Sequence, residues 1–301
     1  MAESASVRDG VGGNSERAQL EAFRALAADL APRDLQDLMS YPFFSLSKSK
    51  RIRPIDYHAG DIAIRVEGTT EHGIATIWDA DVLIWAASQI VEARDVGIPT
   101  SRLIMATPYE ILGFVGRDTS GRAYRGLKAA LDRLQSTTVA TSIRQPSNRR
   151  LHRFSWINEW KERATGEGRP LGLELVVPDW FYASVIDSSL ILTIDRAYFS
   201  LTGGIERWLY RLARKHAGKQ PDGWRFDFRH LHVRSGSLAR YSDFAIDLRR
   251  IARVGVLPGY RMAIERSRRG AEVLHVRASS TVRIERTVAQ LAARFRIGGN
   301  L

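Results

Sequence analysis

Two arginines three residues apart, Arg122 and Arg125, are the clearest candidates for chemistry in this sequence. Residues three apart on a helix project from one face, so both guanidinium groups would point the same way. A guanidinium can donate two hydrogen bonds to O6 and N7 of a guanine, or it can hold backbone phosphates. Ser120 and Lys128 belong to the same expected helix, and the four residues together predict a surface that reads DNA.

A second group of candidates lies in the last quarter of the chain and at two expected hairpin tips. The expected helix over residues 238–253 carries Arg240, Ser242, Arg249 and Arg250. The hairpin tips carry Arg144, Arg149, Arg150, Arg266, Arg268 and Arg269. Any single one of these arginines is more often a solvated surface charge than a base contact. Their clustering is what indicates a nucleic-acid partner.

The helices and strands expected to position these residues follow the same order in both halves of the chain. In the first half, apolar periodicity predicts helices and then strands over residues 79–94, 107–116, 120–135, 137–143 and 151–157. The second half repeats this order over residues 205–217, 227–236, 238–253, 260–265 and 272–277. Helices followed by a basic two-stranded hairpin are typical of a winged helix, whose third helix enters the major groove. The sequence therefore predicts an α+β fold of two tandem winged-helix domains.

The expected domain boundaries follow from this repeat. Residues 1–34 are expected to hold a disordered tail and an N-terminal helix over 16–30. The first winged-helix domain is expected over 35–165 and the second over 166–280. Residues 281–301 are expected to form a C-terminal helix or tail. An additional hairpin is expected from the strands 61–67 and 73–78, and the charged stretch 158–170 is expected to be a linker.

Composition points to the same class of partner. The formal net charge is +12, and residues 196–270 hold 17 Lys and Arg against six Asp and Glu. A basic excess of this kind favours a polyanionic partner. No apolar run is long enough to span a membrane, so a membrane partner is not expected. The chain has no cysteine, which excludes disulfides and thiolate metal sites and fits a cytoplasmic protein.

Two features suggest enzymatic alternatives. His230 and His232 have the His-x-His spacing of metal-dependent origin nickases of the HUH type, with Tyr241 or Tyr260 as the nucleophile. The flanking residues, however, predict a short helix, on which side chains two apart diverge by roughly 200° and do not share a metal. A glycine-rich run at 121–128 lacks the Gly-Lys-Ser/Thr ending of a phosphate loop. We therefore expect no catalytic residue, no metal and no cofactor.

Five segments together resemble one protein family. They are MSYPFFSLSKSKRIRPIDY at 39–57, ADVLIWA at 80–86, YRGLKAALDRL at 124–134, IERWLYR at 205–211 and SDFAIDL at 242–248. In these segments the chain resembles the plasmid replication initiator protein A family, which is similar to the iteron-type initiators. The resemblance extends from about residue 35 to residue 277.

The resemblance implies a function. Members of such families bind repeated sites in double-stranded DNA of a plasmid origin, promote opening of a nearby AT-rich region, and lead to loading of the host initiator and the replicative helicase. A homodimer that represses its own gene is a further implication. The residues alone leave a plain winged-helix transcriptional repressor as an equal alternative, since both roles need the same duplex-binding scaffold.

Overall fold

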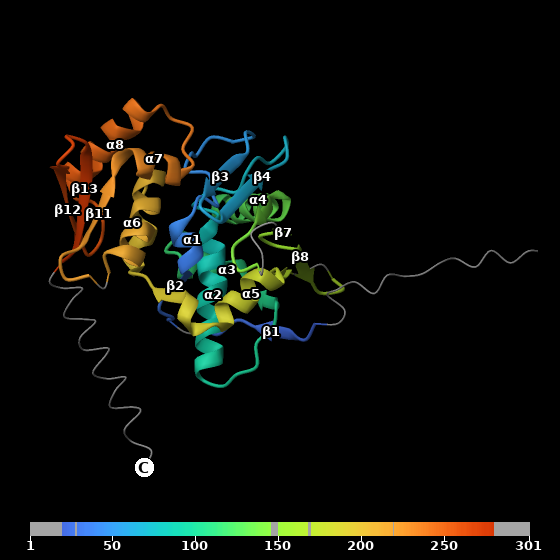
Figure 1. The fold of residues 1–301 in the computed structure, drawn as a ribbon. Coiled ribbons are helices and arrows are strands. Elements are labelled where there is room, and N and C mark those ends of the chain that lie inside the picture. The colour runs from blue at the N-terminus through green and yellow to red at the C-terminus, as the bar shows by residue number, and fades with distance from the viewer. Residues whose placement is uncertain (1–19, 28, 146–149, 168–169, 219, 280–301) are drawn as a thin grey trace, which may run out of the picture.

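The computed structural model describes residues 20–27, 29–145, 150–167, 170–218 and 220–279. Two groups of helices and strands lie side by side, the first from the N-terminal half and the second from the C-terminal part (Figure 1). One connected cluster of buried apolar side chains runs through both groups. The expected tail at residues 1–14 and the expected helix at 281–297 lie outside the described residues.

The first unit is built on an α–β–α–α–β–β order of elements. These are α2 (Ala80–Asp95), β5 (Leu103–Ala106), α3 (Pro108–Phe114), α4 (Gly121–Ser136), β8 (Glu159–Ala164) and β9 (Pro170–Val176). Two strands of another sheet, β6 (Thr138–Thr141) and β7 (His152–Ser155), come between α4 and β8 in the chain. In the sheet, β9 lies between β5 and β8 and is antiparallel to both. A short strand, β1 (Ala22–Arg24), extends the sheet by pairing in parallel with β5.

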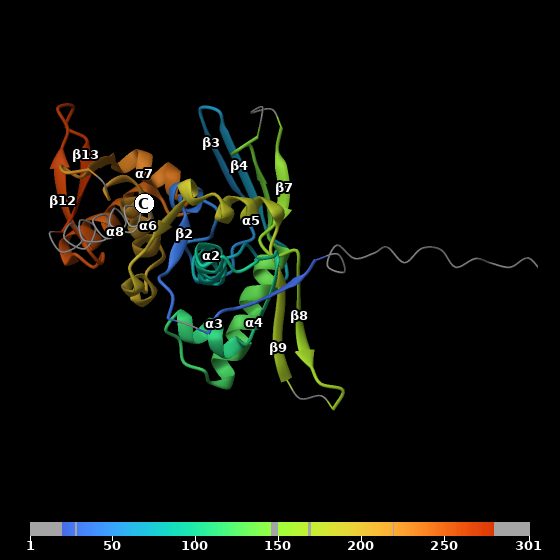
Figure 2. The same cartoon turned by 90° about the horizontal axis from the view of Figure 1, so that it is seen from below.

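The second unit repeats this order. Its elements are α6 (Gly204–His216), β11 (Trp224–Asp227), α7 (Phe228–Ser235), α8 (Tyr241–Val254), β12 (Tyr260–Arg266) and β13 (Glu272–Ala278). Here β13 lies between β11 and β12 and is antiparallel to both, as β9 is in the first unit. The β8–β9 and β12–β13 hairpins lie at opposite sides of the molecule (Figure 2). The two units therefore share the order and the pairing of these elements, but the strands expected over 137–143 and 151–157 do not belong to the shared set.

Local sequence signals mark the ends of several helices. Thr107 and Glu110 form a capping box at the start of α3: Thr107 Oγ1 accepts from Glu110 N at 3.2 Å, and Glu110 Oε2 accepts from Thr107 N at 2.6 Å. Ser120 caps α4 by accepting from the backbone of Ala123 at 3.3 Å. Gly255 ends α8 in the left-handed conformation, which glycine adopts without strain.

A separate four-stranded sheet corrects two expectations. Its order is β3 (Ile55–Ala59), β4 (Ile62–Glu67), β6 (Thr138–Thr141) and β7 (His152–Ser155). The sequence predicted a first basic hairpin from the strands 137–143 and 151–157. These strands correspond to β6 and β7 and belong to this sheet, not to the sheet of β5, β9 and β8. The strand expected over 73–78 was also wrong: β4 pairs with β3, because Gly60 (φ 55°) allows a tight turn before it.

Two further expectations about local structure were wrong. The described part of residues 16–30 contains β1 and no helix, because Phe23 and Leu30 reach the core from an extended chain. The stretch 158–170, expected as a linker, forms β8 and the start of β9. Consequently the expected boundary between 165 and 166 falls inside a hairpin whose two strands pair with each other.

The remaining elements join the two units. They are β2 (Arg33–Leu35), α1 (Gln36–Ser40), α5 (Asp179–Ile186), the 3-10 helices at Ser188–Leu190 and Arg196–Ser200, and β10 (Ile191–Thr193). Strand β2 pairs antiparallel with β10, which precedes the second unit. A Cβ atom on Gly204, at the start of α6, would lie 1.9 Å from the carbonyl oxygen of Leu46. The first turn of α6 therefore approaches the first unit too closely for any residue except glycine.

Candidate nucleic-acid interface

Helix α4 presents its basic residues to solvent. Leu127, Leu131 and Leu134 are buried on one side of the helix, as the apolar stripe predicts. Arg122 and Arg125 are exposed on the helix, and no carboxylate in the described part of the chain forms an ion pair with either. Both guanidinium groups are thus free to meet a ligand, while Ser120 serves as the helix cap.

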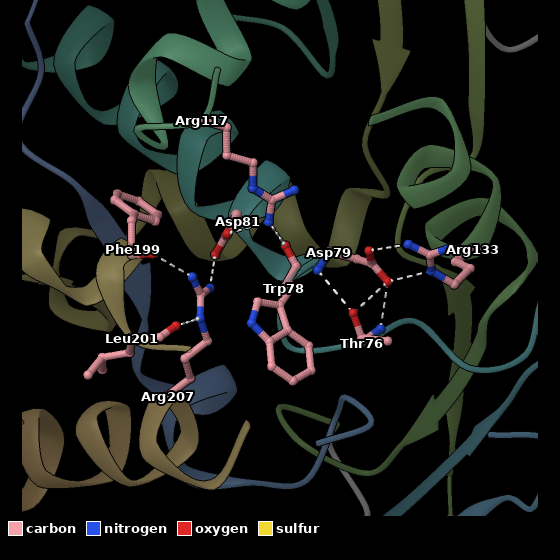
Figure 3. A network of polar contacts seen from close by, with 9 residues as sticks. All are labelled: Thr76, Trp78, Asp79, Asp81, Arg117, Arg133, Phe199, Leu201 and Arg207. Carbon is pink, nitrogen blue, oxygen red and sulfur yellow. Dashed lines mark hydrogen bonds and ion pairs between the residues drawn. The ribbon is translucent and has the colours of Figure 1, made fainter. Parts of the chain in front are cut away.

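Farther along α4, two cations have partners within the protein. Lys128 Nζ lies 2.7 Å from Glu162 Oε1, and both side chains are partly exposed. Arg133 donates to both carboxylate oxygens of Asp79 at 2.8 and 2.7 Å (Figure 3). Asp79 is nearly fully buried, so this pair fixes the end of α4 to the start of α2. The free cations of α4 are therefore confined to its N-terminal half.

Helix α8 shows the same division in the second unit. Phe244, Leu248 and Ile251 are buried, as predicted. On the outer side Ser242 is exposed, and Ile246 is 60% exposed in spite of its apolar side chain. An exposed large apolar residue within a row of polar ones is a feature that a partner surface would explain.

The arginines of α8 differ in their freedom. Arg240 immediately precedes the helix, is 85% exposed at its side chain, and pairs loosely with Asp243 at 3.1 Å. Arg250 is 57% exposed and lies 3.7 Å from Glu206. Arg249 donates to both oxygens of Glu272 at 2.9 and 2.6 Å, and this hydrogen bonding lowers the pKa of Glu272. Arg249 therefore ties α8 to β13, which leaves Arg240 and Arg250 as the more accessible candidates.

A basic cleft opens between α7, α8 and the tip of the β12–β13 hairpin. It has a volume of about 450 Å³ and is lined by Asp227, Arg229, Tyr241, Arg249, Arg266, Arg269, Gly270, Ala271 and Glu272. The three tip arginines predicted from the sequence are all exposed: Arg266, Arg268 and Arg269. Arg229, on α7, was not predicted; its guanidinium lies 4.6 Å from the centre of the Tyr241 ring. Its position next to the tip follows from the packing of α7 and is not visible in the sequence.

The tip residues expected in the first unit have different surroundings. Arg144 adopts a positive φ of 61°, and its guanidinium lies 3.8 Å from the centre of the Trp180 ring and 3.3 Å from Asp37. Its side chain is only 27% exposed. These contacts indicate that Arg144 holds its loop in place. Arg150 is exposed, and Arg149 lies outside the described residues.

A buried polar network joins α6 to the first unit (Figure 3). Asp81, on α2, lies 2.7 Å from Arg207 Nη1 and 3.0 Å from Arg117. Arg207 also donates to the carbonyl oxygens of Leu201 and Phe199 at 2.8 and 2.9 Å. Burial raises the pKa of Asp81 to about 6, although both arginines act in the opposite direction. The guanidinium of Arg207 is thus fully used in fixing α6 to α2.

Two further contacts cross between the units. Arg211, one turn farther along α6, donates to both oxygens of Asp34 at 2.7 and 2.9 Å, and each side chain is only 2% exposed. Arg51 donates to the carbonyl oxygen of Gly236 at 2.6 Å, in the turn between α7 and α8. These contacts fix α6 to β2 and fix the turn before α8 to the segment that contains Arg51. None of the residues involved was predicted, because each pair joins positions far apart in the sequence.

The His-x-His motif lies on a helix, as predicted. His230 and His232 belong to α7, where His232 contacts the rings of Tyr241 and Phe244. In the described part of the chain, no three His, Asp or Glu side chains gather in a way that could hold a metal ion. Within the same residues, no helix is long and apolar enough to cross a membrane.

Comparison with known families identifies the class of protein. The family model of replication initiator protein A matches residues 33–262. A relative described as "Putative replication protein" from Wigglesworthia glossinidia brevipalpis is 33% identical over 227 residues, which cover 74% of this chain and 81% of the relative. The chain therefore belongs to the replication initiator protein A family, as the sequence segments indicate.

Solved structures support the fold. A crystal structure of domains 2 and 3 of RctB matches with a TM-score of 0.58 and 14% identity, covering 81% of this chain and 98% of the other. A second structure of RctB domains 2-3 matches with a TM-score of 0.53, also at 14% identity, covering 82% and 97%. At this identity the likeness concerns the fold, a mixed α/β arrangement that extends over both units.

Proposed function

We propose that this chain is a replication initiator that binds specific sites in duplex DNA through two winged-helix units. The observation that carries the proposal is the repeated α–β–α–α–β–β order, in which the third helix of each unit bears exposed arginines. In a winged helix that third helix enters the major groove and the hairpin lies along the backbone. On this assignment the first wing is the β8–β9 hairpin, whereas the second is β12–β13.

The proposed contacts divide into two kinds. Base contacts come from Arg122 and Arg125 on α4 and from Arg240 and Arg250 at α8, where a good bidentate pair with guanine is worth roughly 1–3 kcal/mol of discrimination. Arg249 joins them on binding only if it exchanges Glu272 for DNA. Phosphate contacts come from the tip arginines, from Lys128 and Arg150, and from Arg229, which lines the basic cleft.

The rigid connection between the units supports reading by both at once. The pairs Asp34–Arg211 and Asp81–Arg207, together with the bond from Arg51 to Gly236, fix α6 and α8 against the first unit. We call α4 and α8 the two reading helices. Because their spacing is fixed, they select sites whose two half-sites have a fixed spacing. Gripping two such half-sites would bend the DNA and favour melting nearby, at a deformation cost that depends on the sequence.

In this proposal the chain has no catalytic residue, and binding energy alone does the work. Origin binding would open an adjacent AT-rich region and allow host initiator and helicase to load. A strand-cleavage assay on supercoiled origin DNA with Mg²⁺ or Mn²⁺ tests this directly. Cleavage that is lost in Tyr241→Phe would establish a nickase instead.

A transcriptional repressor is the second candidate, because the same duplex-binding scaffold serves both roles. A replication test separates them. The gene is supplied in trans to a plasmid that carries the origin but no initiator gene, and plasmid maintenance is measured. Maintenance that depends on Arg125 supports the initiator, whereas DNA binding without maintenance supports the repressor.

A further inference from the structure

Residues 47–53, here named the bridging segment, form an exposed basic stretch between α1 and β3. Their sequence, SKSKRIR, contains four cations and no acidic residue. Lys48, Lys50 and Arg53 are exposed, and Ile52 is 48% exposed. Neither reading helix includes these residues, and the proposed function so far gives them no contact with DNA.

The bridging segment is held in place by hydrogen bonds. Arg51 is 8% exposed, and its guanidinium donates to the carbonyl oxygens of Arg53, Pro54 and Gly236 at 2.9, 3.1 and 2.6 Å. Burial, and next the charge of Arg53, lowers the pKa of Arg51 to about 10, so Arg51 keeps its charge at neutral pH. Lys50 Nζ donates to the carbonyl oxygen of Thr70 at 3.0 Å. A segment anchored in this way presents its other side chains in a fixed direction.

The bridging segment lies between the two reading helices. On one side, Lys48, Ser49 and Lys50 line a cleft of about 540 Å³ together with Gly126 and Ala129 of α4. On the other side, Ser47, Ser49, Lys50 and Arg51 line a groove of about 480 Å³ together with Ser237, Leu238 and Ala239, which directly precede Arg240 and α8. The same few residues therefore adjoin both surfaces that are proposed to enter the major groove.

Two cations of the segment are free to meet a ligand. Lys48 Nζ lies 5.4 Å from the centre of the Trp78 ring, and Arg53 is exposed. Within the described residues neither forms an ion pair with a carboxylate. By contrast, many exposed arginines elsewhere have such partners, for example Arg65 with Asp56 and Glu67.

We propose that Lys48 and Arg53 contact the DNA backbone between the two half-sites, so that the bridging segment is a third DNA-binding element. The ligand is the phosphodiester backbone of duplex DNA that spans from the groove entered by α4 to the groove entered by α8. This inference rests on the proposed function, since it needs both helices on one duplex. The contact of the bridging segment with the backbone adds affinity that does not depend on the base sequence. This affinity is present only when both units are bound to the duplex.

The test measures the salt dependence of binding for the full chain. The probe is a duplex selected by the wild-type protein from a random pool. Each phosphate neutralised adds about 0.9 to the slope of log K against log salt. The variant K48A/R53A should therefore lose about 1.8 from the slope, so that raising salt from 50 to 200 mM weakens wild type about 12-fold more than the variant. The control R24A/R65A makes the same change in net charge at residues paired with carboxylates and should keep the wild-type slope.

A second measurement locates the contact. Single phosphates of the selected duplex are replaced by neutral methylphosphonates. Replacement between the two half-sites should weaken wild type and leave K48A/R53A unchanged. If K48A/R53A has the slope and the methylphosphonate pattern of wild type, while R125A and R268A are impaired, only the bridging role is wrong. If R125A and R268A also bind as wild type does, the proposed function itself is wrong.

Discussion

The buried pair of Asp34 and Arg211 gives the sharpest prediction about stability. Replacing Arg211 with Met removes a guanidinium that is 2% exposed and leaves the carboxylate of Asp34, also 2% exposed, without its two hydrogen bonds at 2.7 and 2.9 Å. An unpaired charge at such a site is far more costly than the pair itself was beneficial.

The expected magnitude follows from that burial. Breaking a buried pair by removing one partner costs about 3–5 kcal/mol, whereas removing both charges is often nearly neutral. R211M and D34A should therefore each lose about 3–5 kcal/mol of unfolding free energy. The double variant D34A/R211M should lose much less than the sum, with a coupling of about 3 kcal/mol or more by the same reasoning.

Reversible urea unfolding followed by tryptophan fluorescence measures these values. The exposed pair Asp56–Arg65, with side chains 51% and 47% exposed, is the matched control, and its single variants should stay within about 1 kcal/mol of wild type. A loss below about 1 kcal/mol for R211M, or additive effects in the double variant, would contradict the claim that this pair joins the two units.

Three further predictions concern DNA reading and pH. R125A should reduce the discrimination at one base pair by about 1–3 kcal/mol. R268A should lower affinity for all duplexes and reduce the slope of log K against log salt by about 0.9. If R125A weakens binding to specific and random duplex equally in a titration, this division between the two arginines is wrong. Ile246, which is 60% exposed on α8, should contact a thymine methyl group. Replacing thymine by uracil at one position should then weaken wild type and not I246A, and a uracil scan that affects both proteins equally would contradict it. Because burial raises the pKa of Asp81 from 3.8 to about 6, the folded state binds this proton more tightly than the unfolded state, so its stabilising effect is present below about pH 4 and lost as pH rises through 6. Between pH 4 and 7 wild type should lose roughly 2 kcal/mol more than D81N in urea unfolding, and equal slopes would refute the assignment.

The helices of the two units could be predicted well from the sequence, whereas α1 and α5 were not predicted and the helix expected over 16–30 was wrong. Apolar residues at helical spacing and local caps such as Thr107 and Ser120 are short-range signals, and they placed α2, α3, α4, α7 and α8 within a few residues. The exposed positions of Arg122 and Arg125 followed from the same periodicity. The candidate face of each reading helix was therefore accessible without a structure.

Strand pairing was harder to predict, because the hydrogen bonds of a sheet depend on distant partners. The charged stretch 158–170 looks like a linker in the sequence. In the structure it contains β8, whose backbone pairs with β9, while its side chains mostly face solvent. The sequence also carries no signal for contacts between positions such as Asp34 and Arg211, which lie 177 residues apart. For the same reason the position of the bridging segment beside α4 and α8 had to come from the structure.

In the proposed function both units read one duplex at the same time. Hydroxyl-radical footprinting of wild type on its selected duplex tests it most directly, with R125A and R250A as the matched variants of the two reading helices. We expect two protected regions whose centres lie about 10 base pairs apart or a multiple of that. R125A should weaken the protection of one region and R250A that of the other. A single protected region that neither R125A nor R250A changes would contradict simultaneous reading by both units.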